Sequence, residues 1–168
     1  MHSRRFFFPS LHKYDIILGN YYSSTEDPVG YPTSTRLFLG GINTTSLNAK
    51  TFEQLFPIVS QIVFKRVVGL KNKELFSDQM TTHGHGQQKG FLQRLEFVEV
   101  DGCEDICTMF PKKLLQALKN LKKVNIESCK SLEEVFELDE ESNEEKELPL
   151  PSSLTTLKLS CLLELKCI

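Results

Sequence analysis

The side chains best suited to chemistry in this sequence are histidines, cysteines and a block of carboxylates. His83 and His85 form the only close histidine pair. A zinc site would need further nitrogen, sulfur or carboxylate ligands at suitable spacing, and none accompanies this pair. Because glycines surround both histidines, residues 82–88 favour an exposed loop over a metal site.

The cysteines fit structural positions better than reactive ones. They are odd in number, contain no C-x-x-C pair, and are expected to be free thiols in a reducing compartment. Cys103 and Cys129 hold equivalent places in a repeated pattern described below, which predicts small side chains buried under a turn. The five are Cys103, Cys107, Cys129, Cys161 and Cys167.

The acidic block at residues 137–147 has no order that would converge its carboxylates on calcium. A solvated loop explains it better than a calcium site or a surface for a basic partner. Neither of the glycine motifs that cradle phosphate groups occurs. With no catalytic constellation, we expect a non-enzymatic protein with no metal or cofactor in this chain.

Composition sets further limits on the class of protein. The chain has 168 residues, 40% of them hydrophobic and 25% charged, with a formal net charge of −2. This fits one domain or an open repeat array. A nucleic-acid partner is disfavoured because no basic excess is present. No apolar run could span a bilayer or act as a secretory signal, so we expect a cytoplasmic protein.

One pattern of apolar residues is written twice between residues 95 and 135. Its spacing changes from every second residue, which suits a short strand, to every third, which suits a turn. Such a unit cannot bury its own apolar face and needs similar neighbours, as in a leucine-rich repeat. The copies are Leu95, Val98, Val100, Cys103, Ile106, Met109 and Leu121, Val124, Ile126, Cys129, Leu132, Val135.

Weaker copies on both sides extend the pattern to about six units over residues 1–168. The sequence predicts an α/β repeat solenoid, an irregular leucine-rich-repeat horseshoe segment with parallel strands on the concave face and short helices and loops on the convex face. Helices are expected at residues 49–59 and 112–120, and loops at 20–35, 71–90 and 137–149. The predicted strands lie near residues 14–18, 36–40, 61–65, 97–101, 123–127 and 156–160.

Alternation along each strand places every second side chain on the concave face. Exposed apolar residues beside charges of both signs favour a surface that contacts protein. An inert, solvated face is the alternative interpretation. The candidate protein-binding residues are Phe38, Val63, Lys65, Phe97, Glu99, Asp101, Lys123, Asn125, Glu127 and Lys158.

Two stretches carry a resemblance to a known family. Residues 121–137, LKKVNIESCKSLEEVFE, and residues 154–168, LTTLKLSCLLELKCI, closely resemble repeats of plant intracellular immune receptors of the coiled-coil, nucleotide-binding, leucine-rich-repeat (CC-NBS-LRR) family. Residues 11–19 and 67–72 are similar to the preceding repeats of the same family.

The resemblance implies a role in plant defence. The repeat surface would sense a pathogen effector or an altered host protein, and would restrain the receptor's own nucleotide-binding domain. The family's ADP or ATP would be bound by that domain, which is absent from these residues, so a fragment of a receptor is expected. The alternative is a leucine-rich-repeat adaptor that recruits ubiquitin-ligase substrates, which an F-box-like helical region upstream would favour.

Overall fold

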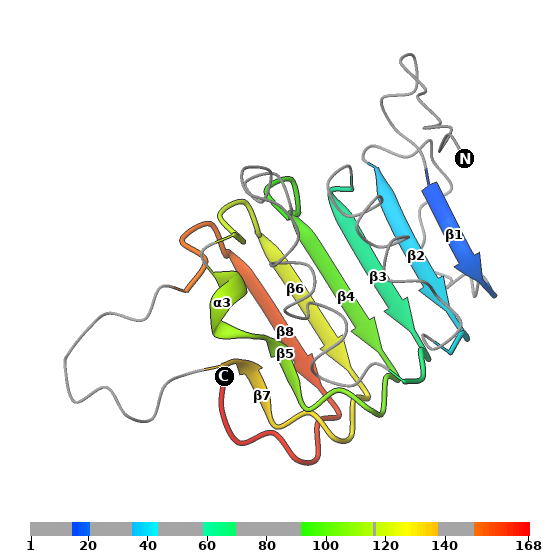
Figure 1. The fold of residues 1–168 in the computed structure, drawn as a ribbon. Helices are drawn as coiled ribbons and strands as arrows, with labels where there is room; N and C mark the ends of the chain where they lie inside the picture. Colours follow the sequence, from blue (N-terminus) through cyan, green and yellow to red (C-terminus); the bar gives the residue numbers. More distant parts are fainter. Residues whose placement is uncertain (1–14, 21–34, 44–58, 70–91, 116, 138–149) are drawn as a thin grey trace, which may run out of the picture.

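The computed structural model describes residues 15–20, 35–43, 59–69, 92–115, 117–137 and 150–168. Six short strands form one parallel sheet, shown as a row of arrows in Figure 1. The strand order β1-β2-β3-β4-β6-β8 follows the chain, so each repeat adds its strand beside the previous one. The strands are β1 Asp15–Gly19, β2 Arg36–Gly40, β3 Gln61–Lys65, β4 Phe97–Asp101, β6 Lys123–Glu127 and β8 Thr156–Ser160.

The second and fourth residue of every strand form two ladders of aliphatic and aromatic side chains. Neighbouring strands pair without a register shift, so each apolar side chain lies beside its equivalent in the next repeat. In the central strands these side chains are at most 1% exposed, whereas those of β1 and β8 are half-buried. The ladders are Ile16, Leu37, Ile62, Val98, Val124, Leu157 and Leu18, Leu39, Phe64, Val100, Ile126, Leu159.

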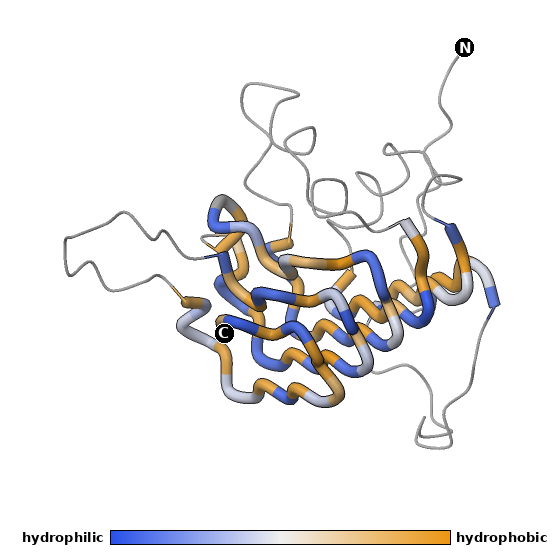
Figure 2. The backbone as a smooth tube through the Cα atoms, turned by 90° about the horizontal axis from the view of Figure 1, so that it is seen from below, coloured by the Kyte–Doolittle hydropathy of each residue, from blue (hydrophilic) through white to orange (hydrophobic). Residues whose placement is uncertain are grey.

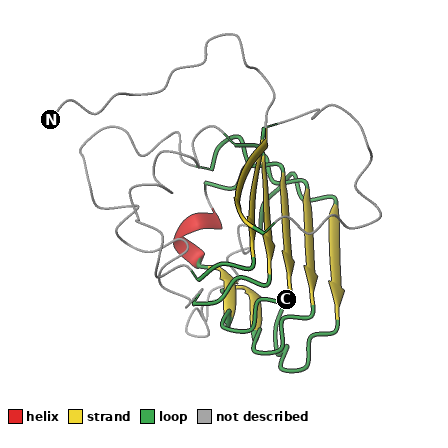
Figure 3. Ribbon diagram, turned by 90° about the vertical axis from the view of Figure 1, so that its right-hand side faces the viewer, coloured by secondary structure: helices red, strands yellow, loops and turns green. Residues whose placement is uncertain are grey.

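A second layer lies on one side of the sheet, as the side view in Figure 3 shows. It contains helix α3, Lys112–Leu115, and a parallel pair of strands, β5 Thr108–Phe110 and β7 Glu134–Phe136. The rings of Phe110 and Phe136 stack with centroids 5.4 Å apart. The hydropathy colouring in Figure 2 alternates along the strands, as expected for a sheet with only one face in the core.

Each repeat turns away from its strand in the same backbone conformation. The residue after β2, β3, β4, β6 and β8 has a positive φ in every case: Gly41, Arg66, Gly102, Ser128 and Cys161, with φ between 52° and 63°. In the first four of these, the N–H donates to the carbonyl that ends the next strand, at 2.8 to 3.1 Å. The left-handed turn therefore aims a hydrogen bond from each repeat to its neighbour.

These observations show the predicted repeat solenoid. Five of the predicted strand ranges coincide with the observed ones, and β1 lies one residue later than expected. The horseshoe curvature and the convex layer of helices stay predictions. The helix at residues 49–59 and the loops lie outside the described residues, apart from positions 20, 35, 59 and 137 at their ends.

Two details of the prediction were wrong. The repeat pattern makes Ile16 of the first copy equivalent to Leu39 of the second, but in the structure Ile16 pairs with Leu37 and Leu18 pairs with Leu39. The helix expected over residues 112–120 ends at Leu115. Beyond it the N–H groups of Ala117 and Leu118 donate three residues back, because the chain tightens into turns before the next strand.

No helix among the described residues is long and apolar enough to cross a membrane.

The left-handed turn conformation predicts that two substitutions affect the free energy of unfolding in different directions. Gly102→Ala places a Cβ in the left-handed region and should lower the free energy of unfolding by roughly 1–2 kcal/mol. Ser128→Gly removes a Cβ from the same conformation one repeat later and should raise stability or leave it unchanged. Urea titration followed by circular dichroism measures both, and destabilisation by Ser128→Gly would contradict the account.

The ladders predict a sharp contrast between adjacent residues of β6. Ile126→Ala should lower the free energy of unfolding by about 2–5 kcal/mol, because it leaves a cavity between Val100 and Leu159. Asn125→Ala changes the opposite face and should cost less than about 0.5 kcal/mol. Equal losses for the two variants would show that β6 does not have a single buried face.

Candidate protein-binding face

The first, third and fifth residues of the strands point away from the core and form the open sheet face. The pairing register arranges them in three rows that cross the strands. Row one is Asp15, Arg36, Gln61, Phe97, Lys123, Thr156; row two is Ile17, Phe38, Val63, Glu99, Asn125, Lys158; row three is Gly19, Gly40, Lys65, Asp101, Glu127, Ser160.

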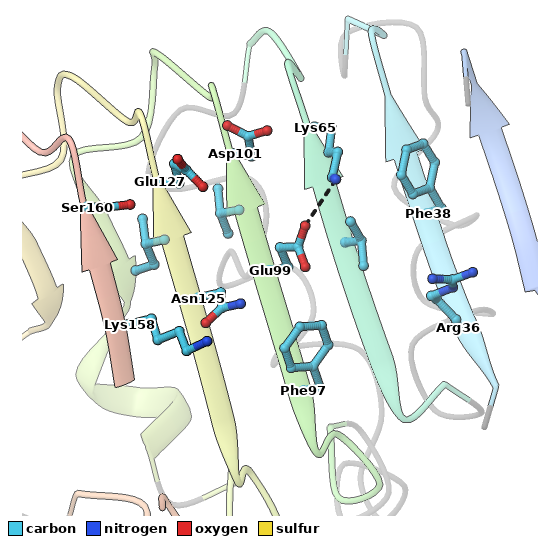
Figure 4. Close-up of a pocket in the computed structure, with 13 residues that line it drawn as sticks. Arg36, Phe38, Lys65, Phe97, Glu99, Asp101, Asn125, Glu127, Lys158 and Ser160 are labelled. Atoms are coloured by element: carbon cyan, nitrogen blue, oxygen red, sulfur yellow. Dashed lines mark ion pairs between the residues drawn. The ribbon is translucent and has the colours of Figure 1, made fainter. Parts of the chain in front are cut away.

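A hollow of about 520 Å³ lies on this face between β2 and β8. Its lining side chains come from the neighbouring strands β2, β3, β4, β6 and β8, and Figure 4 shows how they lie. All the predicted binding residues line the hollow except Lys123. Arg36 and Ser160 also line it; strand alternation places both on the concave face, although they are not among the candidate binding residues.

Ion pairs between described residues connect neighbouring strands across the open sheet face. Arg36 makes two contacts with the carboxylate of Asp15, at 3.0 and 3.3 Å. Lys65 lies directly opposite Asp101 in the pairing register, but its Nζ is 3.2 Å from Glu99, one row away. The Lys65 side chain is only 14% exposed, so this cation is held in a fixed position.

Asp101 and Glu127 are left side by side in row three, near the carboxyl ends of β4 and β6. Within the described residues, neither carboxylate has an ion-pair partner. Lys158 lies opposite Asn125 in row two and points toward it in Figure 4. The part of the face between β4 and β8 is therefore polar, and its charges of both signs have no ion-pair partner within the described part of the chain.

The expectation that Phe38 and Val63 are exposed was wrong. They are 3% and 4% exposed, whereas Phe97 is half-buried. The Phe38 ring lies over Gly40, where an added Cβ would be 2.6 Å from the ring. Val63 lies between Phe38 and Glu99 in row two, and these two longer side chains cover it.

Cys103 and Cys129 occupy equivalent positions in the two clearest repeats, and both thiols are buried. Cys103 and Cys129 donate to the carbonyls of Asp101 and Glu127, at 3.6 and 3.3 Å. Burial raises the pKa of the Cys103 thiol to about 12, and a backbone hydrogen bond with Val67 offsets part of that effect. Burial also raises the pKa of Cys129. Both positions therefore hold neutral, unreactive side chains.

No group of three or more histidine, cysteine or carboxylate side chains within the described ranges could hold a metal ion. His83 and His85 lie outside those ranges. The open sheet face thus offers hydrogen bonds and charges from rigid strands, which suit recognition of another molecule by contact.

Comparison with protein families gives a match over residues 66–168 to the model described as "Plant disease resistance protein RPS2-like, leucine-rich repeats". This region contains β4, β6 and β8 with both clear copies of the repeat pattern.

A curated relative points the same way. The chain is 30% identical over 99 residues to a probable disease resistance protein of Arabidopsis thaliana. The aligned region covers 56% of this chain but only 11% of that relative. No solved structure matches the chain significantly.

The thiols give a prediction that depends on burial and pKa. A maleimide reagent should modify the exposed Cys161 first, while Cys103 and Cys129 stay protected. At pH 9.0 Cys103 should still stay unlabelled, because burial raises the pKa of its thiol to about 12 in the folded chain. Mass spectrometry of the digested protein reports each site.

The same pKa shift has a consequence for stability. The pKa of the Cys103 thiol is higher in the folded chain than its ordinary value of 9.0. The stabilising contribution of this thiol is therefore present below pH 9.0 and is lost as the pH rises toward about 12.

The control for the labelling experiment is denaturant, which should make all five cysteines reactive. Labelling of native Cys103 as fast as Cys161 would contradict its burial.

Proposed function

Because the chain belongs to the leucine-rich-repeat family of RPS2-like plant disease resistance proteins, we propose that it is a non-catalytic recognition module of an intracellular plant immune receptor. Its open sheet face would bind a protein partner during the defence response. The partner would be a pathogen effector, a host protein that an effector alters, or the receptor's own nucleotide-binding domain.

The observation that supports this proposal most is the hollow on the open sheet face. One face of the sheet contributes the core, and the other presents side chains from five strands around a space of about 520 Å³. Rigid strands hold these groups in place, which lowers the entropic cost of ordering them on binding. A protein surface with complementary charges could contact several repeats at once.

The composition of the face favours a protein over a small substrate. Its charges, amides and one half-buried aromatic ring are spread over three rows, as expected at the polar part of a protein interface. A small-molecule site is usually a more enclosed and mainly apolar cleft. The family match and the Arabidopsis relative both name disease resistance proteins, and neither names a ubiquitin-ligase adaptor.

Nucleotide binding, which the family is known for, would not take place on this chain. ADP or ATP would be bound by a nucleotide-binding domain outside these residues, and the repeat surface would restrain that domain until a ligand displaces it. The module would act in the cytoplasm, where effectors delivered into the cell are encountered.

Photo-crosslinking of the full chain in leaf tissue tests the proposal. A crosslinking amino acid at Asn125 lies inside the hollow, whereas the same residue at Lys130 lies on an exposed turn off the open sheet face. We expect Asn125 to give an adduct of defined mass that Lys130 does not give, with the partner then identified by mass spectrometry.

The comparison between challenged and unchallenged tissue separates the partners. An adduct found only after pathogen challenge indicates an effector, and one found in both indicates a host protein or the receptor's own domain. Identical adducts at Asn125 and Lys130, or no adduct at Asn125 in either tissue, would refute recognition through this face.

A further inference from the structure

We infer that the outer edge of β8 binds the outer edge of β1 of a second copy of this chain, so that one parallel sheet continues from copy to copy. β1 and β8 are the outermost strands of the sheet, and no described strand pairs with their outer edges. The inference goes beyond the proposed function, because it concerns the edges of the sheet and not its open face. It is based on the hydrogen-bonding groups, the apolar side chains and the charges at these two edges.

Backbone hydrogen bonds follow one rule from each repeat to the next. The carbonyl of the residue before a strand accepts the first two N–H groups of the next repeat, as Glu96 accepts from Lys122 and Lys123. The N–H of the residue after a strand donates to the carbonyl that ends the next strand, as Gly102 donates to Glu127. All the joins from β2 to β8 show both contacts, so each strand is held at both of its ends.

The same groups are left open at the two outer edges. At β8 they are the carbonyl of Thr155 and the N–H of Cys161, and neither bonds another described residue. At β1 the matching groups are the N–H of Asp15 and the carbonyl of Gly19. All four residues are exposed. A second copy in the register found between repeats would bring each of these donors to an acceptor, as in any parallel ladder.

The apolar ladders are incomplete at the same two edges. Their side chains are fully buried in β3, β4 and β6, but Leu157 and Leu159 of β8 are only half-buried. Ile16 and Leu18 of β1 are half-buried as well. In the proposed register Leu157 would lie beside Ile16, and Leu159 beside Leu18, so both ladders would continue without a change of spacing. Burial of this remaining apolar surface would favour association.

The charges at the two edges are complementary. Lys158, the third residue of β8, is exposed, and in the proposed register it lies diagonally opposite Asp15, the first residue of β1. Within the chain Lys65 contacts Glu99 at 3.2 Å along the same diagonal, from the fifth residue of one strand to the third of the next. Asp15 already pairs with Arg36, but an ionised carboxylate has about four acceptor sites and can accept from both cations.

Lys158 also disfavours a symmetric pairing of two β8 edges. Antiparallel pairing about the centre of β8 would place Lys158 beside its own copy, and like charges directly opposite each other destabilise a sheet. The head-to-tail arrangement uses two different edges, so each added copy leaves one edge of each kind open. The assembly should therefore lengthen as concentration rises and should not stop at a dimer.

Sedimentation velocity of the full chain over a range of micromolar concentrations tests the assembly. We expect the weight-average mass to rise steadily with concentration and to pass that of a dimer. Lys158→Glu places an acid diagonally opposite Asp15 and should weaken association by roughly tenfold. Lys123→Glu makes the same charge change on β6, one strand away from the edge, and should leave association unchanged. Circular dichroism checks that both variants are folded.

Disulfide crosslinking tests the register. Ile17 and Lys158 are the central residues of the two edge strands and would be neighbours across the join. Equivalent residues of paired strands are about 4.8 Å apart, which lies within the Cα separation that a disulfide spans. Under mild oxidation, Ile17→Cys combined with Lys158→Cys should give a ladder of oligomers linked from position 17 to position 158. Each single variant lacks one partner of this link and should not form it.

Three results would overturn the inference. The first is a mass that stays at that of the monomer at every concentration, and the second is equal association of Lys158→Glu and Lys123→Glu. The third is a mass that stops at a dimer, with a link between two copies of position 158 in the Lys158→Cys variant, which would show symmetric pairing instead. None of these results decides whether Asn125 crosslinks a partner, so recognition through the open sheet face is tested separately.

Discussion

The structure depends on unshifted parallel pairing between repeats. A five-residue strand has too few apolar side chains to exclude water alone, but pairing in register places each of them against its equivalent on both sides. The exposure values follow this rule, since Val124 and Ile126 at the centre are buried and Leu157 and Leu159 at β8 are half-buried. Stability is therefore shared between neighbours, and no single repeat holds it.

Electrostatics supports the same register. Several ion pairs join equivalent positions of adjacent repeats, with the acid in the earlier repeat and the base in the later one. Each pair is partly or largely exposed and contributes little energy alone. Together they form only when the strands are in the observed register. A one-residue slip would separate the charges and would also turn the apolar ladders to solvent. The pairs are Asp15 with Arg36, Glu96 with Lys122, Glu104 with Lys130, and Glu133 with Lys166.

Sequence periodicity could predict β4 and β6 because each of these strands has an aliphatic residue at its second and fourth positions and a polar residue between them. It misaligned the first repeat because Ile16, Ile17 and Leu18 are consecutive aliphatics that fit either register. It also could not predict that Phe38 and Val63 are buried on the open face. Phe38 is buried because its ring lies over Gly40, and Val63 is buried because side chains of neighbouring strands cover it. Those strands are distant in sequence, so periodicity within one strand does not reveal the contacts.

The alternation that builds the core also separates the open sheet face from the residues that stabilise the fold. Substitutions at the first, third and fifth strand positions alter the open sheet face while the two ladders beneath keep their packing. The hollow draws its lining from several repeats, so a change in one strand modifies one row of contacts. A leucine-rich-repeat chain built this way can vary the residues of its open sheet face with little effect on stability, provided that the left-handed turns and the ladders are kept.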